Sequence, residues 1–148
     1  MAEARAAARL VLIDAEGRVL LFLHVEGSGR EFWATPGGGI DPGESAEGAA
    51  RREAAEELGA KDAAVAPLWT GHTDFVFADR EVSQDETFFL LRQYPTRFGP
   101  EVQRVHRSEG IKKVRWWTLS EIESSAELIF PIDLVQRLKE NLPQLRGQ

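Results

Sequence analysis

The side chains best suited to chemistry in this sequence are three acidic residues of one short segment. Glu53, Glu56 and Glu57 lie in a run rich in alanine, arginine and glutamate, a composition that favours a helix. At 100° per residue, Glu57 and Glu56 fall about 40° and about 60° to either side of Glu53. Carboxylates crowded into one arc repel and raise one another's pKa values. A divalent cation that prefers oxygen ligands, such as Mg²⁺, Mn²⁺ or Ca²⁺, would relieve that repulsion.

The neighbouring arc of the same helix is apolar. Ala50, Ala54 and Leu58 recur at helical spacing, so we expect the acidic arc at the shoulder of the buried face. For the helix taken alone, the alternative is an ordinary solvated face held by pairs such as Arg52 with Glu56. The residues that precede the helix favour the first interpretation.

The spacing across the preceding loop and this helix resembles the Nudix box, the signature of the Nudix hydrolase superfamily. The matching residues are Gly38, Glu44, Arg52, Glu53, Glu56, Glu57 and Gly59. Where the family prefers a bulky aliphatic residue, this chain has Ala54 and Ala60, a departure that concerns packing. The resemblance implies one domain over residues 1–148, with an α/β/α sandwich around a mixed central sheet. It also implies metal-dependent hydrolysis, with Mg²⁺ or Mn²⁺ as the cofactor.

The resemblance implies a role for each position of the box. Glu53, Glu56 and Glu57 would be metal ligands, and one of them would also orient or deprotonate the attacking water. Arg52 would pair with one of these glutamates and fix its rotamer. These four residues, together with Glu44, are the candidate catalytic residues of the box.

The glycine-rich loop before the helix would bring the main chain close to the metal. Gly37 and Gly38 permit a close approach, with the Gly37 carbonyl as an extra oxygen ligand. Gly38 and Gly39 are also predicted to contact substrate, and Glu44 would tie this loop to the helix in a structural or a catalytic role. The loop is not a P-loop, because no Gly-Lys-Ser/Thr follows it, and Pro42 interrupts a dinucleotide-binding G-x-G-x-x-G pattern.

Many members of the family use a further acidic residue outside the box, and Glu109 is the predicted one here. It lies two residues before a predicted strand, at a loop-to-strand junction from which its side chain can reach the helix. A solvated loop glutamate is the alternative. Asp85 and Glu86 are weaker candidates, and Glu101 is weaker still.

Basic and aromatic residues are the candidates for substrate recognition. Arg107 belongs to the main basic concentration of the chain, residues 104–115, which would meet substrate phosphates or form a solvated edge. Trp116 and Trp117 must point to opposite faces of a strand, and Trp117 is the one predicted to contact substrate. Five further aromatic residues of the predicted strands would stack on a base or fill the core; they are Trp33, Trp69, Phe32, Phe75 and Phe77.

Regular elements must position these residues. Extended segments are predicted over 9–14, 18–25, 32–35, 63–78, 86–94 and 111–119. Helices are predicted over 45–58, in a short segment after Thr118 or Ser120, and over 131–142. Residues 37–39 are expected outside any regular element, and residues 95–107 are expected to form a polar loop. This mixture predicts an α/β domain with a mixed sheet.

Composition narrows the class of protein. The chain has 148 residues, no cysteine and a net charge of −6. Without cysteine there are no disulfides or thiolate zinc sites, which fits a cytoplasmic location. The net negative charge argues against a DNA or RNA polymer or an anionic membrane as the partner. The expected partner is a small nucleotide, and the chain is expected to be a monomer or a homodimer.

The predicted function is hydrolysis of a pyrophosphate linkage in a nucleoside diphosphate derivative. An NTP or dNTP, oxidised forms included, or a dinucleoside polyphosphate would be the substrate. An ADP-ribose or nucleotide-sugar pyrophosphatase is the alternative within this class. A non-catalytic ligand-sensing module is an alternative from another functional class. Such modules typically lack residues of the Nudix box, whereas this chain has all of them. An isomerase of the same fold would call for a cysteine, which the chain lacks.

Overall fold

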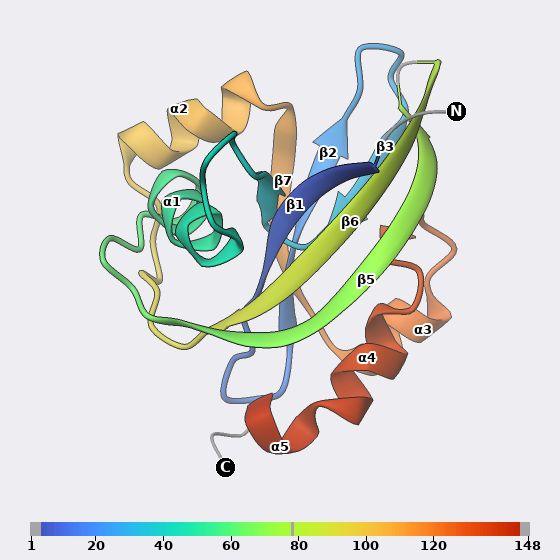
Figure 1. The fold of residues 1–148 in the computed structure, drawn as a ribbon. Helices are drawn as coiled ribbons and strands as arrows, with labels where there is room; N and C mark the ends of the chain where they lie inside the picture. Colours follow the sequence, from blue (N-terminus) through green and yellow to red (C-terminus); the bar gives the residue numbers. More distant parts are fainter. Residues whose placement is uncertain (1–3, 78, 146–148) are drawn as a thin grey trace.

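The strands form two four-stranded mixed sheets (Figure 1). The computed structural model describes residues 4–77 and 79–145. One sheet has the order β4-β1-β6-β5, formed by Gly37–Gly39, Ala4–Val11, Arg80–Leu91 and Val65–Phe77. The other has the order β7-β2-β3-β8, formed by Ile111–Trp117, Val19–Val25, Glu31–Ala34 and Ile129–Phe130. Strand β1 runs parallel to β6 and antiparallel to β4, and β3 runs parallel to β8 and antiparallel to β2.

The helices of the described residues lie in two layers on either side of the strands (Figure 1). Helices α1 (Ala46–Leu58) and α2 (Pro100–Ser108) form one layer. The other consists of α3 (Leu119–Ser124), α4 (Leu134–Glu140) and α5 (Leu142–Leu145). The predicted α/β/α sandwich is thereby confirmed, with its mixed central layer divided into two sheets.

Alternating side chains of the strands fill a core on each side. Leu10 and Phe22 pack into the cluster that contains the apolar face of α1, whereas Val11 and Leu21 pack into the cluster that contains Leu134 of α4. Successive strand residues point to opposite faces, so the apolar residues of β1 and β2 serve both cores.

Helix α1 begins and ends where the sequence predicts. The Ser45 hydroxyl accepts a hydrogen bond from the Gly48 N–H at 3.0 Å, which satisfies one of the free donors of the first turn. Gly59 has a φ of 71°, and its N–H returns to carbonyls of the last turn. Glycine adopts this left-handed conformation without a steric penalty, so the helix ends there.

Helix α2 occupies most of the segment predicted as a polar loop, and that prediction is wrong. Pro100 lies in its first turn, and Val102 and His106 form its buried face. Two buried side chains, one of them a histidine, leave too little apolar periodicity for a sequence pattern to indicate a helix.

Residues 37–39 form the short strand β4, contrary to the sequence-based prediction. Gly37 lies opposite Arg9 and Gly38 opposite Ala8 in an antiparallel pairing with β1. A Cβ at Gly37 would lie 2.2 Å from the Ala8 oxygen, so this pairing requires glycine.

Other predicted strands differ at their boundaries. Strand β1 starts at Ala4 and β6 at Arg80, both earlier than predicted. Residues 4–11 of β1 pair in parallel with residues 83–90 of β6, and residues 80–82 of β6 pair with the end of β5. The chain turns between β1 and β2, where the Asp14 carboxylate accepts from the Arg18 N–H at 2.8 Å. The two strands nevertheless belong to different sheets. Ala78, the last residue of the strand predicted over 63–78, lies outside the described residues.

Candidate active site

Helix α1 and strand β4 hold two acidic side chains against the main chain. Glu53 and Glu57 are 6% and 2% exposed, whereas Glu56 is exposed to solvent. The Gly37 N–H donates to Glu57 Oε1 at 2.8 Å. A Cβ on Gly38 would lie 2.8 Å from Glu53 Oε1, so glycine is what lets this carboxylate lie beside β4. The prediction that the acidic side chains lie beside the buried apolar face of α1 is confirmed for Glu53 and Glu57.

Arg52 joins α1 to the loop that precedes it. Its guanidinium donates two hydrogen bonds of 2.9 Å to the Glu44 carboxylate, one of 2.9 Å to Glu53 Oε1 and one of 2.9 Å to the Gly39 carbonyl. The hydrogen bonds from Arg52 and from the Asp41 N–H lower the pKa of Glu44 to about 2. The predicted pairing of Arg52 with a glutamate and the link from Glu44 to the helix are both present.

Burial and neighbouring charge raise the pKa values of both buried glutamates. For Glu57 the largest cause is burial, followed by a hydrogen bond with Glu109 and by the charges of Glu53 and Glu109. For Glu53 burial again comes first, and the hydrogen bond from Arg52 acts in the opposite direction. The fold therefore places carboxylates where their negative charge is penalised, and a bound cation would remove that penalty.

Glu109 lies beside the buried glutamates. It is the C-cap residue of α2, is itself exposed, and interacts with both Glu53 and Glu57. The expectation that this residue reaches the helix is confirmed, and its chemical role stays a prediction. Of the weaker candidates, Asp85 faces His72 at 2.7 Å, and Glu101 is exposed in the first turn of α2.

Glu86 belongs to a buried polar network that sequence reasoning did not find. Its carboxylate accepts from Arg9 Nε at 3.1 Å and from Gln84 Nε2 at 2.9 Å. Arg9 Nη1 also donates to the carbonyls of Thr35 and Gly37, at 3.4 and 3.2 Å. The Gly37 carbonyl retains its second lone pair, so its proposed role as a metal ligand still stands. One signal was available in the sequence, namely the opposite charges of Arg9 and Glu86, each at the start of a strand predicted over an apolar run.

The donor atoms fit a hard divalent cation. Glu53 Oε2 is buried and has no hydrogen-bond partner, while Oε1 of the same carboxylate is held by Arg52. Glu57 and Glu109 add two more carboxylates, and oxygen-only donors suit Mg²⁺ or Mn²⁺. Within residues 4–77 and 79–145, no three His, Asp or Glu side chains already surround a single point at ligand distance. The fit therefore rests on donor chemistry and on the open oxygen of Glu53.

We expect Mg²⁺ to raise the melting temperature. A ligand that binds only the folded state adds about 2.7 kcal/mol at 100 times its Kd, which corresponds to roughly 5–10 °C for a domain of this size. Circular dichroism melts with and without MgCl₂ measure the shift. The shift should be much smaller in Glu57→Gln and unchanged in Glu47→Gln, an exposed glutamate of the same helix. Equal shifts in both variants would contradict this placement of the ion.

A family model described as a NUDIX domain matches residues 3–138 of the chain. The chain belongs to the Nudix hydrolase family. The Nudix family, fold and pyrophosphohydrolase class predicted from the sequence are therefore confirmed, and Nudix hydrolases generally need divalent metal ions. The stretch from Gly38 to Ala60, which contains the loop and α1 of this site, is the Nudix box.

Solved structures of other Nudix proteins share the fold. The MutT protein from Methanosarcina mazei Go1 has 19% identity and a TM-score of 0.67, over 97% of this chain and 98% of that one. The NUDIX domain of Shewanella oneidensis NrtR, complexed with ADP ribose, has 18% identity and a TM-score of 0.68, over 96% of this chain and 90% of that one. A C. elegans Ap4A hydrolase has 18% identity and a TM-score of 0.62, over 98% of this chain and 100% of that one. At these identities the likeness shows the fold alone.

The residues predicted to contact substrate are only partly gathered at the Nudix box. Gly38 and Gly39 are there, and Arg107 is exposed in the last turn of α2, two residues before Glu109. The basic residues around Arg107 do not form one patch. Lys112 pairs with Glu31 at 3.1 Å on a different strand, so the segment 104–115 is largely a solvated edge.

The prediction for Trp117 is wrong. Its side chain is 1% exposed and packs edge-on against Trp33, with ring centroids 5.1 Å apart. The Arg115 guanidinium covers it at 3.7 Å. Trp116 is half-buried, and it lines a cavity of about 220 Å³ together with Tyr94. Strand alternation separates the two tryptophans, but the register of β7 on β2 and the cluster that contains Trp33 and Leu134 decide which one enters the core.

Half-buried rings from both sheets form a row, and its first ring, His24, interacts with Glu109. His24 stacks on Phe32 at 5.1 Å, and Phe130 lies 5.7 Å from both Phe32 and Phe75. Burial, and next the charge of Arg9, lower the pKa of His24 to about 4, while the charge of Glu109 acts in the opposite direction. We call His24, Phe32, Phe75 and Phe130 the aromatic row. The side chain of Phe77 lies outside the described part of the chain.

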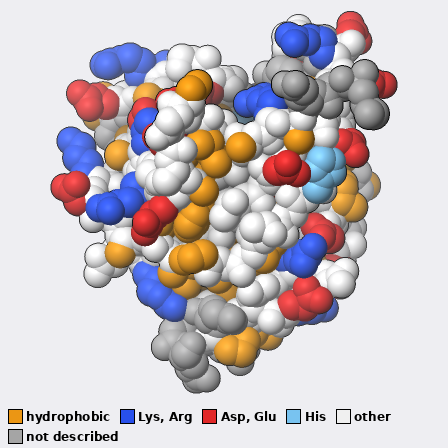
Figure 2. Space-filling view, viewed as in Figure 1, with side chains coloured by type: hydrophobic (Ala, Val, Ile, Leu, Met, Phe, Trp, Pro, Cys, Tyr) orange, Lys and Arg blue, Asp and Glu red, His pale blue; other side chains and the backbone are white. Residues whose placement is uncertain are grey.

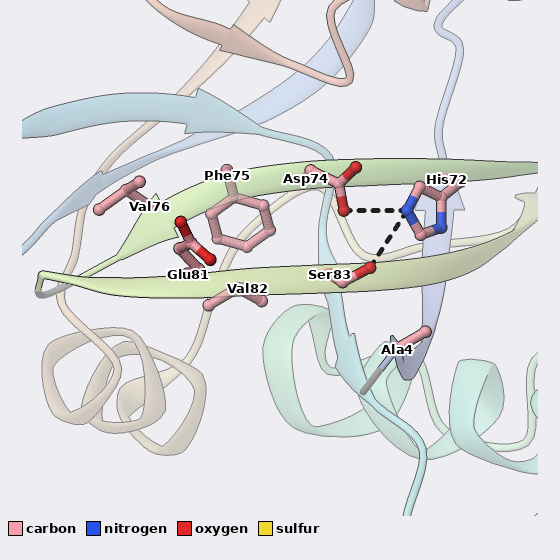
Figure 3. A pocket seen from close by; sticks show the side chains of 8 residues that line it. All are labelled: Ala4, His72, Asp74, Phe75, Val76, Glu81, Val82 and Ser83. Atoms are coloured by element: carbon pink, nitrogen blue, oxygen red, sulfur yellow. Dashed lines mark hydrogen bonds and ion pairs between the residues drawn. The ribbon is translucent and has the colours of Figure 1, made fainter. Parts of the chain in front are cut away.

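A second cavity, of about 640 Å³, lies on the β5–β6 ribbon and is lined by none of the box residues (Figure 3). His72 Nε2 lies 3.0 Å from Asp74 and 3.1 Å from the Ser83 hydroxyl, and Nδ1 lies 2.7 Å from Asp85. The two carboxylates face opposite ring nitrogens, so they cannot bind one metal ion together with His72. Because they favour the charged ring, His72 is also unsuited to accept a proton from Ser83.

This geometry makes a prediction about pH. Hydrogen bonds to Asp85 and then to Asp74 raise the pKa of His72 above 6.5. Its stabilising contribution is therefore complete below about pH 6.5 and is lost as the pH rises through the folded-state pKa. An NMR titration of the ring protons measures the pKa, and Asp85→Asn should lower it. A wild-type value at or below 6.5 would contradict the contact.

Proposed function

We propose that this Nudix domain hydrolyses a pyrophosphate linkage in a nucleoside diphosphate derivative. The observation that carries the proposal is the pair of buried carboxylates, Glu53 and Glu57, held beside Glu109 in a complete box. A chain of net charge −6 needs a cation to meet an anionic substrate. Carboxylates placed where their charge is penalised supply the site for that cation.

Each residue of the site has a proposed role in that reaction. Glu53, Glu56 and Glu57 hold Mg²⁺ or Mn²⁺, which when bound offsets charge on the pyrophosphate oxygens. Arg52 fixes the Glu53 rotamer through its 2.9 Å hydrogen bond and keeps the loop on α1. A water oxygen forms a bond to phosphorus, the bond to the bridging oxygen breaks, and Glu109 or a box glutamate takes the water proton.

The aromatic row supports a nucleotide as the substrate. Its rings are only half buried, come from both sheets and lead away from Glu109, so a base could stack on them while its phosphates reach the box. We propose an NTP or dNTP, oxidised forms included, or a dinucleoside polyphosphate, with ADP-ribose or a nucleotide sugar as the second candidate. The fold does not choose among these, because a MutT protein, an ADP ribose complex and an Ap4A hydrolase share it.

A small-molecule partner agrees with the surface. Figure 2 shows acidic and basic side chains interspersed on one face. A nucleic-acid polymer would require a basic patch instead. No helix of the described residues is long and apolar enough to cross a membrane. A cytoplasmic location and a monomer or homodimer stay predictions.

A panel of nucleotides tests the proposal. NTPs, 8-oxo-dGTP, Ap4A, ADP-ribose and a nucleotide sugar are incubated with Mg²⁺ or Mn²⁺, and the products are identified by mass spectrometry. In ¹⁸O water, the labelled product identifies the phosphorus that is attacked. We expect cleavage of at least one member. Binding of a member by calorimetry without cleavage of any would indicate instead a ligand-sensing module.

A further inference from the structure

His106 is a buried polar side chain of α2 that contacts the helix of the Nudix box. It is 7% exposed, and its ring packs against Phe22 and Phe98, with centroid distances of 5.0 and 5.2 Å. Nε2 lies 2.6 Å from the backbone oxygen of Glu57. A carbonyl oxygen only accepts hydrogen bonds, so Nε2 carries the hydrogen in this contact.

The Glu57 carbonyl needs a donor from outside its helix. It lies in the last turn of α1, where carbonyl groups have no intrahelical partner. The N–H groups of Gly59 and Ala60 return to the carbonyls of Ala54 and Ala55 instead. His106 therefore caps the helix at the residue whose side chain is the most deeply buried carboxylate of the site.

The same end of α2 places Glu109 against the Glu57 side chain. The Glu109 N–H donates to the carbonyls of Val105 and His106, at 3.0 and 3.3 Å, so Glu109 takes its position from the turn that contains His106. The Glu109 carboxyl in turn hydrogen-bonds with that of Glu57. One turn of α2 thus holds Glu57 at its main chain and at its side chain.

We propose that His106 is a positioning residue that sets the separation of the Glu57 and Glu109 carboxyl groups. The kinetic part of this inference rests on the proposed function. His106 contacts the Glu57 backbone and neighbouring rings, and it acts through the two carboxylates. A misplacement of about 1 Å can cost about 100-fold in rate, so loss of the Nε2–H lowers kcat rather than raising KM.

Two substitutions separate the hydrogen bond from packing. His106→Leu keeps an apolar side chain between Phe22 and Phe98 but removes the donor, and we expect kcat to fall about 10–100-fold with little change in KM. His106→Gln carries an amide N–H at a similar distance along the side chain and should recover most of that loss. His72→Leu, at an exposed histidine outside the site, is the matched control with unchanged kcat. Full kcat in His106→Leu, or equal losses in the Leu and Gln variants, would overturn the proposal.

Two further measurements test the mechanism by which His106 acts. If it works through Glu109, the effects of His106→Leu and Glu109→Gln on kcat are non-additive in a double-mutant cycle, and additive effects would count against it. Mn²⁺ affinity, measured by electron paramagnetic resonance without substrate, should be about tenfold weaker in His106→Leu. This readout remains if no nucleotide of the panel is cleaved, so the two proposals fail separately. Wild-type Mn²⁺ affinity in His106→Leu would itself refute the positioning role.

Discussion

Glu57→Gln is expected to lower kcat by about 1,000-fold or more and to leave the fold intact. Glutamine matches the shape of the side chain and can still accept the hydrogen bond from Gly37. It cannot carry the negative charge that binds a cation or takes a proton. Burial raises the pKa of Glu57, so the carboxylate weakens the metal-free fold at neutral pH. The variant should therefore melt no lower than the wild-type protein in the absence of metal.

Phosphate or pyrophosphate release with the best nucleotide of the panel measures kcat, and circular dichroism measures the melting temperature. Glu47→Gln, exposed on the same helix, serves as the matched control and should retain wild-type turnover. Near-normal turnover of Glu57→Gln, with its full metal content, would refute the assignment of this residue.

Arg52→Lys is expected to lower both activity and stability. The guanidinium bonds Glu44, Glu53 and Gly39 at the same time, and a lysine ammonium cannot reproduce that planar arrangement. Release of the Glu53 carboxylate should reduce kcat roughly 10–100-fold. Loss of charged hydrogen bonds at a side chain that is 28% exposed should lower the free energy of unfolding by about 1–3 kcal/mol.

Urea unfolding and steady-state kinetics measure the two effects. Arg51→Lys is the control, since Arg51 precedes Arg52 in α1 and is exposed. If the two lysine variants behave alike, Arg52 does not hold the site in the way its contacts indicate.

Local chemistry accounts for what could be predicted from the sequence. Helix α1 ends at Gly59 and is capped by Ser45, because these signals act between residues close together in the chain. The buried glutamates follow from the same helix, since its periodicity places acidic and apolar arcs side by side. Helix α2 escaped prediction because its buried face consists of Val102 and His106 alone, and its position is set by packing on β7 and on α1, which is distant in the sequence.

The sequence by itself determined the family, the helix of the box and the acidic residues on it, because each depends on spacing along one continuous segment. Tertiary structure decided which side chains from distant segments meet these residues. Arg9 reaches the Gly37 carbonyl, His106 reaches the Glu57 backbone, and Trp117 enters the core in place of Trp116. Contacts of this kind depend on how sheets and helices pack across the chain, and no local pattern encodes that packing.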